Sequence, residues 1–299
     1  MSGLDHDEGA VRTLAGLLAA PGDGGDRRRY AVLPSTDRPR YVVPVGRRHA
    51  AAVHLRPGPG VVGAGSRHAL RAALRLGAGR LAPSRVEVAD GDATGPGLRR
   101  HLASLLDVDD VDVAIAIGRP RANRKPVVQV IDGRGATVAW AKVGVDRRTD
   151  DLVARETEAL TEVADRAGIV VPPVLAAGSW GGHRLLVLAP ITTEESAGEL
   201  TLTADVIETI AGPTREHEPT ATAWWRDMQT VATGCPGLAA RLDRLGPALS
   251  GRRWPFGRWH GDLAPWNACW VDGRLTVWDW ERSAPSVPLG LDVIHNRVQ

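Results

Sequence analysis

The chain has 299 residues, which is long enough to bury a substantial core in two or three compact units. A formal net charge of +2 argues against a nucleic-acid binder that relies on electrostatic attraction, and no apolar run is long enough to span a bilayer. The N-terminus is acidic where a signal peptide is basic, and Cys235 and Cys269 have no metal-ligand spacing. We therefore expect a cytoplasmic protein without a nucleic-acid or membrane partner.

Residues 1–108 contain predicted elements but no internal repeat and no group of catalytic residues. Strands are predicted at 30–34, 41–45 and 86–88, and helices at 66–76 and 98–106, with Gly-rich loops between them. We treat this part as an N-terminal extension without an assigned role. Its simplest interpretation is a structural addition to the domain that follows.

Residues 109–190 combine strands with one long helix. Strands are predicted at 111–118, 127–131 and 136–143, a helix at 149–167, and two short strands within 172–189. Asp150 and Asp151 near the start of the helix suit its dipole, and Gly168 suits its end. Beyond this part, residues 190–193 are the expected hinge, and 194–258 are expected to supply about three helices.

Lysine is rare in this chain. Lys and Arg together number 37, yet Lys occurs only at Lys125 and Lys142. Lys142 lies in the middle of an apolar predicted strand, where an Arg-rich sequence has kept a compact ammonium group instead of a planar guanidinium. The pattern indicates a position that needs this particular cation.

The segment 259–281 holds the most informative pattern of the chain. Asp262 follows His260 and Gly261, Asn267 comes five positions later, and a second run of apolar residues leads to Asp279. An Asp-Gly turn at 272–273 between apolar runs predicts a β-hairpin, which alone could be a surface feature. A loop carboxylate, a nearby amide and a carboxylate at a strand end also suit phosphoryl transfer, so we interpret the hairpin as the scaffold of a site.

These motifs resemble a known family. His260-Gly261-Asp262-Leu263-Ala264-Pro265-Trp266-Asn267, then Trp278-Asp279-Trp280-Glu281, then Pro288-Leu289-Gly290-Leu291-Asp292, are similar to the aminoglycoside phosphotransferase and choline kinase family of protein-kinase-like enzymes. The resemblance implies a bilobal α+β fold with ATP in the cleft, and ATP and Mg²⁺ as cofactors. It implies an ATP-binding small lobe at 109–190, whose order of strands and helix fits, and a large lobe at 191–299.

The resemblance also implies residue roles. Asp262 would be the catalytic base, Asn267 and Asp279 would hold Mg²⁺, and His260 and Asp292 would brace the catalytic loop.

In the small lobe, the resemblance implies that Lys142 binds ATP phosphates, paired with Glu156 on the predicted helix. Glu158 is the alternative partner, and for either residue a solvated helix face is the simpler interpretation. Gly118 opens the turn 118–125, which would cover the phosphates. That turn departs from the Gly-rich loop of protein kinases, so a solvated basic turn competes with this role.

The acceptor is less well defined by the sequence. Of ten Trp residues, six lie at 254, 259, 266, 270, 278 and 280, either as core filling or as an aromatic wall for a cationic or sugar-like acceptor. Trp266, Trp280 and Glu281 are the candidate substrate contacts. Segment 191–230 is acidic, which is typical of a solvated helix face and also suits a cationic acceptor.

Two functional hypotheses remain open. The first is a kinase that phosphorylates a hydroxyl of an amino sugar, aminoglycoside, sugar or amino alcohol. The second is a catalytically silent kinase-like module, because the chain stops at Gln299 where the family continues through several helices. Either the large lobe is small or the sequence is truncated. The intact set of Lys142, Glu156, Asp262, Asn267 and Asp279 favours the enzyme.

Overall fold

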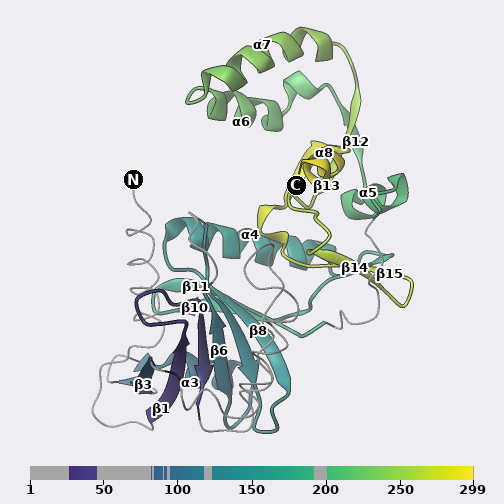
Figure 1. Ribbon diagram of the computed structural model, residues 1–299. Helices are drawn as coiled ribbons and strands as arrows, with labels where there is room; N and C mark the ends of the chain where they lie inside the picture. Colours follow the sequence, from purple (N-terminus) through teal and green to yellow (C-terminus); the bar gives the residue numbers. More distant parts are fainter. Residues whose placement is uncertain are drawn as a thin grey trace. The chain divides into compact units, whose positions relative to one another are not determined.

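The computed structural model describes residues 27–45, 82, 84–89, 91–92, 95–117, 123–191 and 201–298. Within them the fold is α+β, as expected (Figure 1). The chain divides into two compact units, Met1–Thr157 with Pro173–Pro190, and Glu158–Pro172 with Ile191–Gln299. None of the helices in the described ranges combines the length and the apolar character needed to cross a membrane. The helix expected at 66–76 lies outside the described residues.

The first unit is built on an eight-stranded sheet with the order β10-β11-β8-β7-β6-β2-β1-β3. Its strands are β1 (Arg27–Leu33), β2 (Tyr41–Pro44), β3 (Arg85–Ala89), β6 (Asp112–Ala116), β7 (Val127–Ile131), β8 (Thr137–Val143), β10 (Val174–Trp180) and β11 (His183–Leu188). Neighbouring strands pair antiparallel throughout. The sequence predicted these strands, and the pairing of β2 with β6 joins the N-terminal strands to the sheet.

One face of this sheet carries the larger core of the unit. Val128 and Val130 of β7 alternate with residues of the opposite face, as a strand requires, and pack with Leu98 and Leu102 of helix α3 (Leu98–Leu105). Full burial of such an aliphatic side chain contributes about 1.5–3 kcal/mol. The short strands β4 (Gly91–Asp92) and β5 (Gly95–Pro96) pair with each other.

Helix α4 (Arg147–Val163) begins with a reciprocal cap. Asp146 Oδ1 accepts a hydrogen bond from the Thr149 amide at 2.8 Å, and Thr149 Oγ1 accepts one from the Asp146 amide at 3.0 Å. One residue on, Asp150 Oδ1 accepts a hydrogen bond from the Arg184 amide of β11 at 2.7 Å. A Cβ on Gly144 would lie 1.9 Å from that oxygen, so the close approach requires glycine. These contacts fix the start of α4 against β11.

The second unit contains two three-stranded sheets and several helices. One sheet has the order β12 (Arg215–His217), β13 (Trp254–Trp259) and β16 (Ala284–Pro288), and the other β14 (Ala268–Val271), β15 (Arg274–Val277) and β9 (Ile169–Val170). The helices are α5 (Ala204–Ala211), α6 (Ala223–Ala232), α7 (Pro236–Leu249) and α8 (Leu291–Arg297), with short 3₁₀ turns η3 (Pro219–Ala221) and η4 (Trp280–Arg282).

The described part of segment 194–258 supplies three helices, as expected, and two strands as well. Helices α5, α6 and α7 are present, and α6 lies beside α7 around Trp225, Ala232 and Leu242 (Figure 1). Strands β12 and β13 were not predicted. Strand β13 contains Pro255 and Gly257, residue types that are depleted in strands, which weakens the strand signal of its aromatic residues.

The hairpin of β14 and β15 turns at the predicted Asp-Gly pair. Asp272 and Gly273 have φ angles of +49° and +71°, which is the pattern of the tight turn that fits the twist of a hairpin. At the other end of the hairpin, the Trp278 amide donates to the Asn267 carbonyl at 3.0 Å. The hairpin thus brings Asn267 and Asp279 to the same end of two paired strands.

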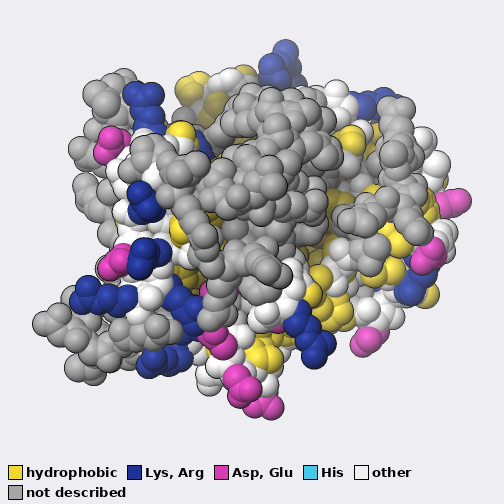
Figure 2. All heavy atoms as spheres, turned by 60° about the horizontal axis from the view of Figure 1, so that its bottom comes forward, with side chains coloured by type: hydrophobic (Ala, Val, Ile, Leu, Met, Phe, Trp, Pro, Cys, Tyr) yellow, Lys and Arg dark blue, Asp and Glu magenta, His cyan; other side chains and the backbone are white. Residues whose placement is uncertain are grey.

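Figure 2 shows Lys and Arg side chains among Asp and Glu side chains on the face that it draws. At the edge of the large sheet, Arg29 of β1 pairs with Glu87 of β3 at 3.2 Å, and both side chains are exposed. Exposed pairs of this kind contribute about 0–1 kcal/mol to stability. Such exposed pairs therefore contribute much less to the stability of the fold than the buried strands do.

Candidate active site

The first unit contains a buried ion pair. Lys142 Nζ donates to both oxygens of Glu156, at 2.5 and 2.6 Å, and the two residues are 4% and 0% exposed. Strand β8 supplies the lysine and helix α4 the glutamate. The alternative partner, Glu158, is exposed on the same helix. Gly118, the other expected contact with ATP, lies outside the described residues.

In the second unit, Asp292 of α8 binds the backbone of the loop that follows β13. Its Oδ2 accepts a hydrogen bond from the His260 amide at 2.8 Å, and its Oδ1 accepts one from the Gly261 amide at 2.9 Å. Asp292 is 3% exposed. Both oxygens of one buried carboxylate therefore hold two successive peptide groups.

The His260 side chain connects the same loop to the hairpin. Its Nδ1 lies 3.2 Å from the Asp262 amide nitrogen, and its Nε2 lies 3.1 Å from the Trp278 carbonyl oxygen. An amide donates and a carbonyl accepts, so these partners assign the neutral ring with the proton on Nε2. Burial lowers the pKa of His260, while Asp292, Asp279, the Trp278 carbonyl and Asp262 oppose this shift. The ring is therefore a neutral structural connector.

Gly261 is required by its backbone. Its φ angle is +80°, a region that favours glycine, and a Cβ there would lie 2.4 Å from the Arg282 carbonyl oxygen. The loop can therefore pass this close to η4 only with glycine at this position.

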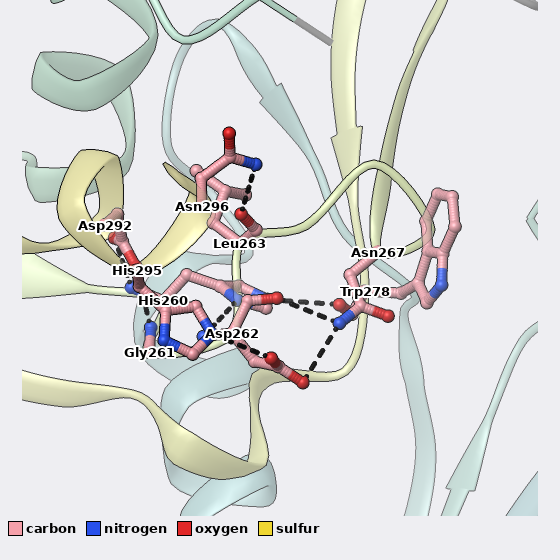
Figure 3. Close-up of polar contacts among 9 residues, drawn as sticks. All are labelled: His260, Gly261, Asp262, Leu263, Asn267, Trp278, Asp292, His295 and Asn296. Carbon is pink, nitrogen blue, oxygen red and sulfur yellow. Dashed lines mark hydrogen bonds and ion pairs between the residues drawn. The ribbon is translucent and has the colours of Figure 1, made fainter. Parts of the chain in front are cut away.

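The carboxylate of Asp262 is contacted from two sides. His295 Nε2 lies 3.0 Å from Oδ1, and Asn267 Nδ2 lies 3.3 Å from Oδ2 (Figure 3). Asn267 Nδ2 also donates to the Asp262 carbonyl at 2.9 Å. The side chain remains 22% exposed, so it is held in place and still reached by solvent.

The orientation of the Asn267 amide follows from these contacts. Because the Asp262 carbonyl and carboxylate accept hydrogen bonds, the nitrogen of Asn267 must face them and its oxygen must point elsewhere. Asp279, half-buried, follows at the same end of the hairpin with a left-handed φ of +69°. An amide oxygen and a carboxylate are donors of the kind that Mg²⁺ binds. The chemistry of this end of the hairpin fits such an ion.

The three candidate substrate contacts differ in exposure. Trp266 is 42% exposed, whereas Trp280 is 0% and Glu281 is 4% exposed. The Trp280 ring packs edge-on against His260, with ring centroids 4.7 Å apart, and its indole N–H donates to the Val277 carbonyl. Trp280 thus supports the loop from within, and Trp266 is the aromatic side chain of this set that solvent reaches.

Sequence reasoning missed two residues of α8 that contact the loop. His295 reaches Asp262, and Asn296 Nδ2 donates to the Leu263 carbonyl at 3.0 Å (Figure 3). The spacing of Asp292, His295 and Asn296 is i, i+3 and i+4, which places all three on one helix face. That spacing is the signal that could have pointed to them.

No protein-family model matches the chain, and no curated protein matches it. Several solved structures are similar to the chain. Macrolide 2'-phosphotransferase MphH from Brachybacterium faecium has 17% identity and a TM-score of 0.41, over 63% of this chain and 72% of that one. The chain is similar in structure to small-molecule phosphotransferases.

Two further structures are similar. A thermostable mutant of aminoglycoside phosphotransferase APH(4)-Ia, in a ternary complex with ADP and hygromycin B, has 15% identity and a TM-score of 0.40, over 64% of this chain and 73% of that one. The amicoumacin kinase hAmiN, in complex with AMP-PNP, Ca²⁺ and Ami, has 15% identity and a TM-score of 0.36, over 61% and 62%. At this distance the likeness assigns no substrate and no residue role to this chain.

Proposed function

We propose that the protein is an ATP- and Mg²⁺-dependent phosphotransferase that moves the γ-phosphate to a hydroxyl of a small molecule. The observation that carries the proposal is the Asp262 carboxylate. It is partly exposed, contacted at both oxygens, and set in a loop whose backbone Asp292 holds. A positioned carboxylate of this kind is what a general base for an attacking hydroxyl requires.

In the proposed reaction, Asp262 accepts the proton of the acceptor hydroxyl. The hydroxyl oxygen forms a bond to the γ-phosphorus as the bond from that phosphorus to the bridging oxygen of ATP breaks. Asn267 and Asp279 would hold Mg²⁺, which neutralises charge on the phosphate oxygens when bound. Lys142, oriented by Glu156, would bind phosphate oxygens through its ammonium group.

The silent-module alternative is less favoured by these contacts. Lys142 and Glu156 form a buried pair, and the carboxylate of Asp262 is oriented by two side chains. A binding module would gain little from either arrangement. A buried ion pair is a weak source of stability, and an oriented, partly exposed carboxylate is useful mainly for accepting a proton. Both features therefore support an enzyme.

For the acceptor, we propose an amine-bearing molecule such as an amino sugar, aminoglycoside or amino alcohol. Of the acidic residues in 191–230, Glu194, Glu195 and Glu199 lie outside the described residues, and Glu218 accepts hydrogen bonds from the Gly251 amide and the Thr220 hydroxyl. The exposed ones are Asp205, Glu208, Glu216 and Asp227. Exposed carboxylates of one sign attract cations, and the attraction is screened by salt.

The test is a screen of the purified protein with γ-labelled ATP and Mg²⁺ against amino sugars, aminoglycosides, neutral sugars and amino alcohols. Reactions without acceptor report hydrolysis of ATP alone and serve as the control. The proposal expects label on an amine-bearing acceptor, with a KM that rises with salt. Label on a neutral acceptor, with a KM that does not depend on salt, would support phosphotransferase activity and reject the cationic acceptor. Absence of label on every acceptor would count against both proposals.

A further inference from the structure

One face of α8 contacts four successive residues of the catalytic loop. Asp292 binds the amides of His260 and Gly261, His295 binds the side chain of Asp262, and Asn296 binds the carbonyl of Leu263 (Figure 3). On the loop side, two backbone amides donate hydrogen bonds, and the Asp262 carboxylate and the Leu263 carbonyl accept them. The helix therefore fixes the orientation of the Asp262 side chain as well as the path of the backbone around it.

The contact with His295 is the closer of the two side-chain contacts of this carboxylate. His295 Nε2 lies 3.0 Å from Oδ1, whereas Asn267 Nδ2 lies 3.3 Å from Oδ2 and also serves the Asp262 carbonyl. An ionised carboxylate only accepts hydrogen bonds, so the proton of the short contact belongs to His295 Nε2. The His295 side chain is 21% exposed, so partial burial protects this hydrogen bond from water.

We propose that His295 is a positioning residue for the general base. Its Nε2–H holds Oδ1 of Asp262, which turns Oδ2 toward the acceptor hydroxyl and limits rotation of the carboxylate. The inference rests on the proposed function, because it assigns His295 an effect through Asp262. A general base that rotates away from its reacting geometry can still accept a proton, but the reaction becomes slower. A displacement of about 1 Å can lower the rate roughly 100-fold.

The first arm of the test compares substitutions at His295. His295→Ala is expected to lower kcat by about 10- to 100-fold while the KM for ATP changes by less than about twofold. His295→Gln should restore most of the rate, because its amide nitrogen reaches about as far as Nε2, and the shorter His295→Asn should not. Ile294→Ala, on the same helix but 60% exposed, is the matched control and should leave kcat unchanged.

The second arm separates positioning from general support of the fold. In an Asp262→Asn background, His295→Ala should cause no further loss of the residual rate, because residues that act as a unit are not additive. An equal loss in both backgrounds would overturn the proposal, and so would an unchanged kcat in His295→Ala.

A third measurement does not depend on activity. In protein labelled with ¹⁵N-histidine, the Nε2 signal of His295 should carry a proton and should move when Asp262 is replaced by Ala. A signal that does not respond would overturn the contact between His295 and Asp262. This measurement remains valid even if His295→Ala folds poorly, because it does not use that variant. Absence of phosphoryl transfer by the wild-type protein, with the signal responding, would instead reject the proposed function.

Discussion

The buried pair of Lys142 and Glu156 shows how strongly one residue depends on another. Both charges lie away from water, at 4% and 0% exposure, so each compensates the other. Removing one partner of such a pair leaves an uncompensated buried charge and costs about 3–5 kcal/mol, whereas replacing both by apolar residues of similar volume is often close to neutral. The pair as a whole therefore adds little net stability, although each charge depends on the other.

Urea denaturation tests this dependence. Lys142→Met should lower the free energy of unfolding by about 3–5 kcal/mol. The double variant Lys142→Met with Glu156→Leu should lose much less, because no charge is then left buried. A double variant as unstable as the sum of the two single variants would contradict the account, since it would mean that the two charges do not compensate each other.

Arginine at this position should not replace lysine in function. Lys142→Arg keeps the charge, but the planar guanidinium is larger than the ammonium that both Glu156 oxygens approach within 2.6 Å. The expected result is a fall in kcat/KM for ATP toward the value of Lys142→Met. Near-normal kcat/KM in Lys142→Arg would show that the position does not bind phosphate as proposed.

His260 should make stability depend on pH in one direction. Burial keeps its pKa in the folded protein below the ordinary 6.5, so below that pH the unfolded chain binds a proton that the folded chain does not. Stability therefore falls as pH drops below about 6.5, by up to about 1.4 kcal/mol per pH unit.

The measurement is the free energy of unfolding at several pH values between 5 and 8, in the wild type and in His260→Gln. The variant should lose this contribution to the slope even if it is less stable overall, because glutamine does not titrate in this range. Identical slopes would contradict a buried neutral histidine at this position.

At the scale of elements, two glycines with similar backbone angles should respond differently to alanine. Gly261 and Gly273 have φ angles of +80° and +71°, but a Cβ at Gly261 would lie 2.4 Å from the Arg282 carbonyl oxygen, while nothing lies within 4 Å at Gly273. Gly273→Ala should cost about 1 kcal/mol for the backbone conformation alone. Gly261→Ala should cost more and should also lower activity, because the loop that carries Asp262 must move.

Thermal or urea unfolding of both alanine variants, together with kcat, is the measurement. Equal losses of stability, with activity unchanged in Gly261→Ala, would show that the loop does not depend on its close approach to η4.

Elements were predictable where local chemistry decides them. The Asp-Gly turn at 272–273 predicts the hairpin because few other residue pairs accept two positive φ angles. Strands β7 and β8 of the large sheet follow from short, mostly apolar runs between turns, and most of their residues are buried. Strands β12, β13 and β16 were not predictable. The three residues of β12 give no period, Pro255 and Gly257 interrupt β13, and Pro285 interrupts β16. Only their pairing with one another makes them strands.

The candidate site divides in the same way. Asp262, Asn267 and Asp279 were found because they lie in one short segment with a recognisable spacing. His295 was missed because its partner, Asp262, is 33 positions away in the sequence, and its spacing from Asp292 indicates a shared helix face without showing what that face contacts. Contacts between distant segments are set by packing, which a single sequence does not display.

At the scale of the whole molecule, the proposal draws on both compact units. The first contributes the ion pair of Lys142 and Glu156, held by an eight-stranded sheet and the capped start of α4. The second contributes the loop of Asp262, held between β13, the hairpin and α8.

The most direct test of the central claim is Asp262→Asn, assayed for γ-phosphate transfer and, by calorimetry, for Mg²⁺-dependent binding of ATP. A positioned general base contributes roughly 10²- to 10⁴-fold to the rate. We predict a loss of turnover of that order with ATP affinity retained. Turnover unchanged by Asp262→Asn, or a wild-type protein that does not bind ATP in the presence of Mg²⁺, would contradict the account.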